Sequence, residues 1–217
     1  MKNKTLFAAA ILLVAFAVWT VLVCCVDVRP IGPQGSAVGF AALNRLFHTL
    51  TGVHMTLYVI TDWLGLVPLA FAMGFALLGL FQWVRRKRLR QVDPSLLILG
   101  GFYLIVGAAY VLFEFLVVNY RPVLIEGFLE ASYPSSTTLL MLCIMPTALM
   151  QLNIRIQNLR FRRWTSSLII VFTAFMVIGR LLSGVHWLTD IIGGTLLSAG
   201  LVTLYASATK LTGKPIP

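Results

Sequence analysis

Six long apolar segments constrain this chain more than any other feature of its sequence. Each is long enough to cross about 30 Å of hydrocarbon as a helix, which takes roughly 20 residues. They are Leu6–Val26, Met55–Val84, Ser95–Val118, Ser136–Leu152, Ser166–Leu182 and Trp187–Ala208. Of the 217 residues, 59% are hydrophobic and only 11% are charged, against about 25% charged residues in soluble domains. We therefore predict an all-α polytopic membrane protein, with six transmembrane helices packed in one bundle and a single membrane domain over residues 1–217.

Two segments need a closer reading. The first follows Lys2 and Lys4 like a signal peptide, but it is long for one, and no small-residue cleavage site precedes Asp27. We interpret it as a retained helix. The second segment is longer than a span requires, which indicates either a tilted helix or one that begins outside the bilayer.

The basic residues between the segments predict the orientation. The chain carries a net charge of +10, and the charges lie in short clusters between apolar segments, which favours membrane topology and anionic lipids over nucleic acid. Only Arg29, Arg45, Arg121 and Arg180 fall on one side. The other side holds Lys2, Lys4, Arg85, Arg86, Lys87, Arg88, Arg90, Arg155, Arg160, Arg162, Arg163, Lys210 and Lys214. By the positive-inside rule, both termini are cytoplasmic in a cell membrane.

The segment between the first two spans, residues 27–54, begins with glycines and prolines that break helices. Residues 38–48 then repeat apolar groups at helical spacing, which predicts a short amphipathic helix at the outer interface. An ordinary covering loop fits this segment equally well. The three cysteines lie inside apolar segments without metal-ligand spacing, so we interpret them as apolar filler.

Three ionisable residues at the outer turn between spans five and six are the first candidates for chemistry, because charges at membrane depth are costly. Arg180 ends span five, and His186 and Asp190 are four residues apart, so they share one helix face if span six begins near His186. A carboxylate that holds one ring nitrogen would make the other a better nucleophile. Arg180 is suited to bind a phosphate with its forked guanidinium.

A second group lies at the same predicted face. Arg121 follows span three, and Ser135 and Ser136 open span four directly after Pro134. Free backbone N–H groups at a helix start bind anions, although a helix cap without a ligand would use the same residues. Together, the two groups indicate an extracytoplasmic phosphate site with a nucleophile.

These residues resemble the motifs of the type-2 phosphatidic acid phosphatases, which include bacterial undecaprenyl-diphosphate phosphatases. The third motif of that family is Ser-Arg, five residues, His, three residues, Asp, and it matches Arg180, His186 and Asp190, with Gly179 in place of the Ser. The Arg-Pro of the first motif matches Arg121, and the Pro-Ser of the second matches Ser135. The resemblance covers a core of about residues 95–208.

The resemblance implies a role for each residue. His186 would attack phosphorus and form a phosphohistidine, and Asp190 would orient it. Arg121 and Arg180 would hold the phosphoryl oxygens, and Ser135 and Ser136 at the helix start would complete the phosphate cradle. The family needs neither a metal nor a cofactor, so none is expected.

Two further departures from the family pattern bear on catalysis. Glu114 stands where the first motif has Lys, and Thr137 stands where the second motif has the His that protonates the leaving group. Loss of a general acid costs about 10²–10⁴ in rate. A diphosphate substrate, whose leaving group is itself a phosphate, would need less protonation. Alternatively, Glu114, Glu126 or Glu130 would supply the proton from a carboxyl with a raised pKa.

We therefore expect a phosphoric-ester or acid-anhydride hydrolase that removes phosphate or diphosphate from a membrane lipid at the outer leaflet. The alternative is a catalytically silent protein that binds or translocates a lipid phosphate on the same scaffold. The expected partners are the lipid substrate and the bilayer. Asp62, which lies within span two, is expected to pair with an arginine or cap a helix, or else to line the site.

Overall fold

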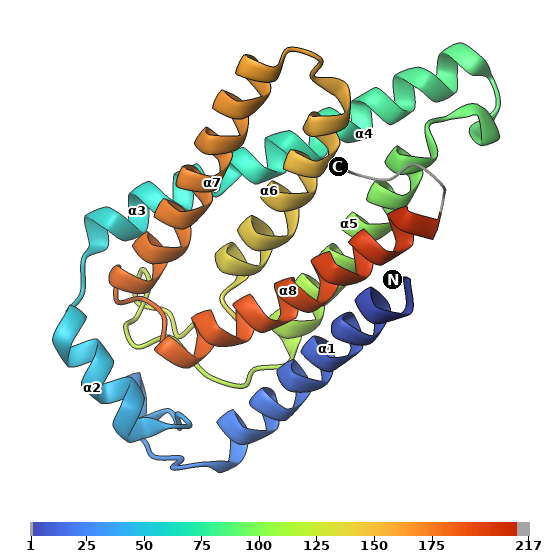
Figure 1. Cartoon of the computed structure of the whole chain (residues 1–217). Coiled ribbons are helices and arrows are strands. Elements are labelled where there is room, and N and C mark those ends of the chain that lie inside the picture. The colour runs from blue at the N-terminus through green and yellow to red at the C-terminus, as the bar shows by residue number, and fades with distance from the viewer. Residues whose placement is uncertain (1, 212–217) are drawn as a thin grey trace.

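The computed structural model describes residues 2–211, and Met1 and residues 212–217, with Lys214, lie outside the described part. Within residues 2–211, two short 3₁₀ turns, η1 (Pro33–Gly35) and η2 (Leu89–Gln91), accompany eight α-helices (Figure 1). The helices are α1 (Lys2–Cys25), α2 (Ala41–Thr51), α3 (Met55–Leu64), α4 (Leu66–Arg86), α5 (Pro94–Phe115), α6 (Ser136–Arg155), α7 (Leu159–Leu182) and α8 (Leu188–Leu211). Over residues 2–211, extended pairing is limited to three isolated bridges. The all-α prediction is confirmed.

In the described part of the chain, six helical stretches are long and apolar enough to cross a membrane, as predicted. They are Lys4–Cys25, Met55–Arg86, Pro94–Phe115, Ser136–Arg155, Leu159–Leu182 and Leu188–Lys210. The chain is therefore a multi-pass membrane protein with one bundle of spans.

The second, third and fifth spans show instructive differences from the sequence prediction. The second span is two helices, α3 and α4, which meet at Gly65, where the Gly65 N–H is shared between the Thr61 and Asp62 carbonyls. The third span ends at Phe115 rather than Val118. The fifth begins at Leu159, seven residues early, because the Asn158 side chain accepts a hydrogen bond from the Phe161 N–H and caps α7 before the apolar segment starts.

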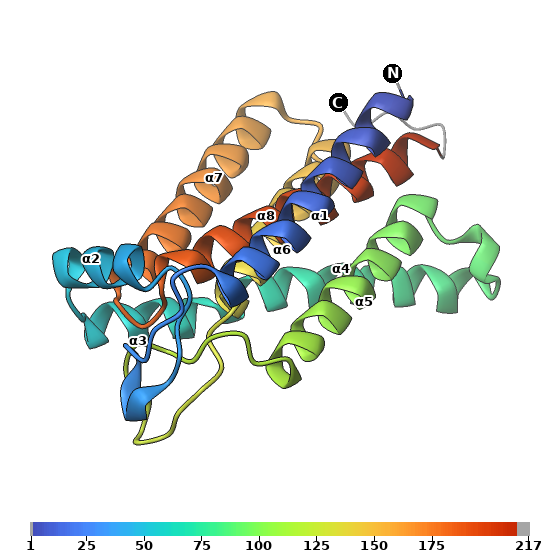
Figure 2. The ribbon, with the colours of Figure 1, turned by 90° about the horizontal axis from the view of Figure 1, so that it is seen from below.

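Helices α6 and α8 form the centre of the bundle. Half of each apolar span is buried inside the protein, against 11–22% in the other spans. Helix α1 lies along α8 in both Figure 1 and Figure 2, where a Cβ on Gly200 would lie 2.7 Å from Leu13. The glycine pair of span six, Gly193 and Gly194, also packs closely, because a Cβ on Gly193 would lie 2.6 Å from the Tyr133 ring.

The amphipathic helix predicted between the first two spans is α2. Its buried residues are Ala41 and Asn44, whereas Leu43, Leu46 and Leu50 are exposed. Its polar contacts therefore face the protein, and its leucines face outward, as they would at a membrane interface.

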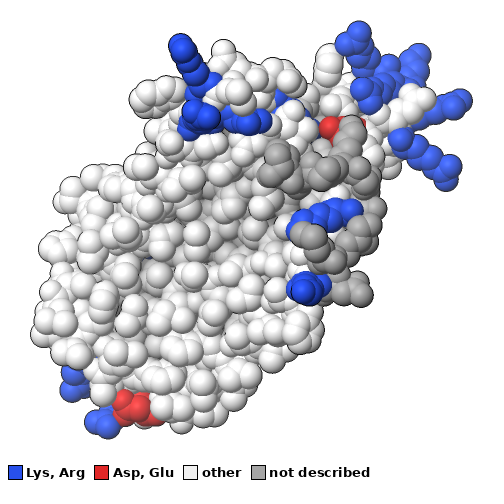
Figure 3. All heavy atoms as spheres, viewed as in Figure 1, with Lys and Arg blue, Asp and Glu red and all other residues white. Residues whose placement is uncertain are grey.

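Charge is distributed unevenly along the bundle. In Figure 3, Lys and Arg side chains gather at the end where α4 turns to α5 and α6 turns to α7, and the middle of the visible face carries almost no charge. The apolar middle fits a hydrocarbon layer. The positive-inside rule predicts that the basic end lies on the cytoplasmic side.

Candidate active site

The predicted site residues meet at the end of the bundle opposite the basic clusters. There α7 ends, α6 and α8 begin, and the loop of residues 116–135 crosses between them (Figure 1). A pocket of about 560 Å³ opens at this end, within the range of small-ligand sites. Its lining residues are Asp62, Tyr110, Glu114, Val117, Tyr120, Arg121, Leu129, Glu130, Ala131, Ser136, Thr137 and Arg180.

His186 and Asp190 are linked through a third residue, Ser132. The His186 Nδ1 lies 3.7 Å from the Asp190 Oδ2, too far for a direct hydrogen bond. The Ser132 Oγ lies 3.1 Å from Nδ1 and donates to Oδ2. The single hydroxyl proton of Ser132 serves Asp190, so the imidazole must donate its own Nδ1 proton to Ser132. This tautomer leaves Nε2 with a free lone pair.

Asp190 is fully buried and held in place by several donors. Its Oδ1 accepts from the Asn119 side chain at 3.2 Å, and its Oδ2 also accepts from the Trp187 N–H at 2.9 Å. A carboxylate with this many donors is held in one position.

The free nitrogen of His186 is buried without a partner. Its Nε2 atom makes no hydrogen bond among the described residues. Burial, together with the positive charges of Arg121 and Arg180, lowers the pKa of His186 to about 4. The imidazole is therefore neutral at pH 7, which is the form that a nucleophile or base requires.

Arg180 is held against α3. It is 1% exposed, and its Nη2 pairs with Asp62 Oδ1 at 3.2 Å. The predicted pairing of Asp62 with an arginine is confirmed, and Asp62 lines the pocket as well. Gly179 permits this approach, because a Cβ there would lie 2.9 Å from the Thr61 methyl group. The Ser of the family motif would therefore require the Thr61 side chain or its helix to shift.

Arg121 approaches the same aromatic ring as Arg180. The Tyr58 ring centroid lies 4.7 Å from the Arg180 guanidinium carbon and 5.8 Å from that of Arg121. Arg121 Nε lies 3.0 Å from Glu130 Oε2, but at an angle that makes no hydrogen bond. Arg121 Nη1 and Arg180 Nε are also buried without partners, and unsatisfied cationic donors of this kind favour an anion.

The hydroxyl residues at the start of α6 have two roles, capping the helix and lining the pocket. Ser135 caps the helix, with its Oγ accepting from Thr138, and its N–H donates to the Asp190 carbonyl. Ser136 and Thr137, at the first helical positions, line the pocket. Their N–H groups belong to the first turn, which lacks carbonyl partners within the helix.

The three glutamates considered as proton donors lie in different places. Glu114, at the end of α5, and Glu130 both line the pocket. Glu126 lies in a tight turn closed by paired bonds between Ile125 and Phe128, away from the pocket lining.

The sequence analysis missed several residues that position this site. Ser132, Asn119 and Tyr58 lie far from the third motif in the chain. Asn44 of α2 is also buried, and it bonds both the side chain and the N–H of Thr189, next to Asp190. The four-residue spacing of Tyr58 and Asp62 was a usable signal, because it places both on one face of α3.

We expect replacement of Ser132 by alanine to lower kcat about 10- to 100-fold, because the imidazole loses the group that fixes its tautomer. The measurement is steady-state phosphate release by purified protein. Ser198→Ala is the matched control, since Ser198 is equally buried but bonds only to carbonyls in the helical core. Equal rates in the two variants would contradict the relay.

Residues 115–213 match the model of the PAP2 superfamily. The match includes Arg121, Ser135, Arg180, His186 and Asp190, so the resemblance found in the sequence is confirmed. This multi-pass membrane protein carries a PAP2-type region.

The whole fold is also similar to a solved structure, described as the first transmembrane PAP2 type phosphatidylglycerolphosphate phosphatase from Bacillus subtilis. The TM-score is 0.55 with 17% sequence identity, over 96% of this chain and 98% of that chain. At this identity, the likeness shows a shared fold. A comparison with curated proteins found no match.

Proposed function

We propose that this protein is a lipid phosphatase that removes phosphate or diphosphate from a membrane lipid through a phosphohistidine. The observation that carries the proposal is the free, buried Nε2 of His186, close to two arginines whose donors are also unpaired. The PAP2-type match and the phosphatase with the same fold support it.

Each residue acts by position and charge, as phosphoryl transfer requires. Arg121, Arg180 and the first N–H groups of α6, at Ser136 and Thr137, bind the phosphoryl oxygens. His186 Nε2 attacks phosphorus, and Asp190 stabilises the resulting imidazolium through Ser132. Water then hydrolyses the phosphohistidine. Ser135 supports the cradle as the cap of α6, with its N–H on the Asp190 carbonyl.

Phosphate release from undecaprenyl diphosphate and phosphatidic acid by the purified protein tests the activity. We expect release from at least one of them. Binding of both lipids without any release would establish the rival function, a catalytically silent lipid-phosphate-binding or translocating protein.

Thr137→His tests whether the site is otherwise complete. We expect monoester hydrolysis to rise about 10²-fold, because the imidazole supplies the missing general acid at the pocket wall. Thr138→His should not raise the rate, because Thr138 is buried and bonds Ser135 instead of lining the pocket. An unchanged rate on phosphatidic acid would show that leaving-group protonation does not limit this enzyme.

We also propose that both termini are cytoplasmic and that the site lies at the outer leaflet. In a background without Cys24 and Cys25, Thr49→Cys in α2 and Arg160→Cys in α7 mark the two ends of the bundle, and both positions are exposed. A membrane-impermeant maleimide applied to intact cells should label only the first. Labelling of only the second would invert the topology.

A further inference from the structure

Helix α2 is attached to the start of α8, the helix that carries Asp190. Thr189 is the second residue of α8, so its N–H has no carbonyl partner within the helix. The Asn44 Oδ1 accepts this N–H at 3.3 Å, and the Asn44 Nδ2 donates to the Thr189 Oγ1 at 3.0 Å. Asn44 is fully buried, and it thereby fixes the helix turn on which Asp190 stands.

The second half of α2 contacts the loop of residues 183–187, which carries His186. The His48 ring lies against the Trp187 ring, with centroids 5.5 Å apart, and the His48 Nε2 donates to the Gly184 carbonyl at 3.2 Å. The turn after α2 is just as close, since a Cβ on Gly184 would lie 2.0 Å from a carbonyl oxygen of that turn. Helix α2 and its turn therefore clamp the His186 loop.

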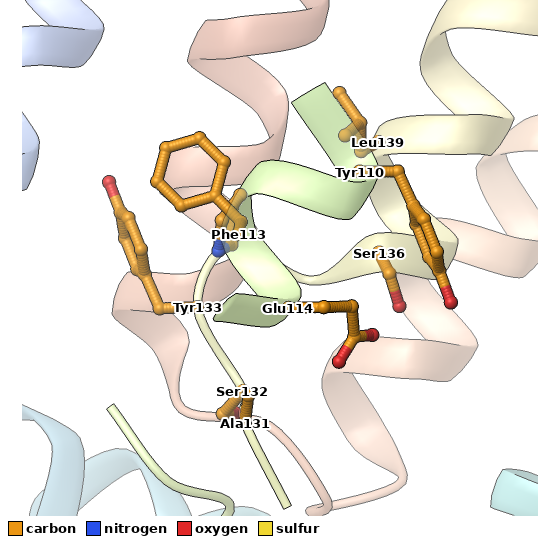
Figure 4. Close-up of a pocket in the computed structure, with 9 residues that line it drawn as sticks. Tyr110, Phe113, Glu114, Ala131, Ser132, Tyr133, Ser136 and Leu139 are labelled. Carbon is orange, nitrogen blue, oxygen red and sulfur yellow. The ribbon is translucent and has the colours of Figure 1, made fainter. Parts of the chain in front are cut away.

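The substrate pocket is formed without α2. Figure 4 shows the recess beside Ser132, with Glu114 and Ser136 in its wall. Among the residues that the structure describes, neither this recess nor the larger pocket is lined by any part of α2. A displacement of α2 would therefore move the His186 loop and leave the pocket wall in place, so it should change kcat much more than KM.

The opposite face of α2 is apolar and points away from the protein. Leu43, Leu46 and Leu50 lie at spacings of three and four residues, so they share one side of the helix. They are 41%, 59% and 75% exposed. In a multi-pass membrane protein, a short helix with such a face lies in the interface, with its leucines among the upper acyl chains.

A basic hollow of about 400 Å³ adjoins this leucine face, and Arg29, Arg45 and Leu46 contribute to its wall. Arg29 already pairs with Asp27 at 2.6 Å. Arg45 is exposed, and within residues 2–211 no acidic side chain pairs with it. A phosphodiester headgroup would complement the charge of Arg45, and the acyl chains below it would contact Leu46.

We infer that α2 docks on an anionic phospholipid of the leaflet at the active-site end, and that this docking activates the enzyme by holding the His186 loop in place. The inference rests on the proposed phosphatase function. Arg45 binds the headgroup, and Asn44 and His48 transmit the position of α2 to the loop. Displacement of a docked α2 would take its leucines out of the acyl chains, which costs free energy in proportion to the apolar area exposed. The lipid is an activator and is not consumed.

Docking is measured first, without a substrate. In a background without Cys24 and Cys25, Leu50→Cys carries a bimane dye, and Cys143 stays unlabelled because it is buried. The protein is reconstituted in nanodiscs of phosphatidylcholine and phosphatidylglycerol, with or without bromine on the upper acyl carbons. We expect the brominated lipid to quench the dye. Equal fluorescence in the two nanodiscs would overturn the docking.

Activation is measured with dihexanoyl phosphatidic acid, which is soluble, so its concentration does not depend on the bilayer. Partial replacement of phosphatidylcholine by phosphatidylglycerol should raise kcat at least about fivefold. Repulsion between the anionic surface and the substrate would change KM, so kcat separates the two effects. Arg45→Gln should abolish the increase. Arg160→Gln is the matched control and should keep it, because Arg160 is also exposed and unpaired but lies at the other end of the bundle.

Transmission through α2 has its own variant. Asn44→Ala should lower kcat about tenfold and remove the response to phosphatidylglycerol, while KM and the quenching at Leu50→Cys persist. Asn153→Ala is the control, because Asn153 is a partly buried asparagine that bonds Ser166 near the opposite end. A tenfold lower kcat that still rises with phosphatidylglycerol would overturn the transmission, because Asn44 would then serve the fold alone.

The outcomes separate this inference from the proposed function. Equal kcat in nanodiscs with and without phosphatidylglycerol would overturn the inference and leave the phosphatase function intact. The same increase in Arg45→Gln as in the wild type would also overturn it, because the lipid would then act elsewhere. Release from neither dihexanoyl phosphatidic acid nor undecaprenyl diphosphate, in nanodiscs where the dye is quenched, would overturn the proposed function itself.

Discussion

Replacement of His186 by alanine is expected to lower phosphate release by at least about 10³-fold, the largest effect of any single substitution in this protein. The reason is that His186 Nε2, which is buried without a hydrogen-bond partner, is the nucleophile of the proposed mechanism. The arginines and the helix start would remain, so lipid binding should persist while turnover stops. The measurement is kcat on the best lipid substrate, together with binding of the same lipid.

The covalent step has its own measurement. With a lipid that carries radiolabelled phosphate, an acid-labile label should appear on the wild-type protein after rapid quenching and be absent from His186→Ala. His54→Ala is the control, because His54 is exposed on the same side of the bundle and bonds only the Thr51 carbonyl through its ring. Residual turnover near the wild-type rate would remove His186 from the mechanism. His186→Asn, which fills more of the buried space, guards against a fold defect.

Replacement of Asp190 by asparagine is expected to lower kcat by about 10²–10⁴-fold, since a neutral amide neither stabilises the imidazolium nor enforces the tautomer. The amide keeps the shape of the carboxylate, but its nitrogen would face Ser132 or Asn119, which are both placed to donate. KM should change much less than kcat, because Asp190 lies behind His186 and outside the pocket lining.

Asp93→Asn is the matched control for Asp190. Asp93 is a carboxylate that pairs with Arg155 at 3.1 Å, and it caps α5 near the opposite end of the bundle. Both variants should lose some thermal stability, but only Asp190→Asn should lose turnover. A similar loss of kcat in both variants would indicate that Asp190 serves the fold and has no special role in catalysis.

The local features of this protein were readable from its sequence. Hydropathy identified all six spans, because a span is a continuous run of apolar residues and needs no information about its neighbours. Arg180, His186 and Asp190 were found together because they lie within eleven positions around one turn. The spacing of apolar residues also predicted α2, the helix before span two.

The boundaries were less predictable, because they depend on single hydrogen bonds. Asn158 starts α7 within a basic segment that hydropathy assigns to a loop. The break at Gly65 separates α3 from α4, and it leaves Tyr58 and Asp62 on a short helix beside Arg180. A hydropathy average over many residues does not detect either feature.

The sequence by itself determined the membrane class, the spans and the proposed nucleophile, since these depend on composition and on short spacings. Only the tertiary structure decided how the nucleophile is held. Ser132 reaches His186 across 54 positions of sequence, and Tyr133 beside it packs into the space that Gly193 leaves in α8. Such contacts depend on how helices pack, and helix packing depends on shapes distributed over the whole chain.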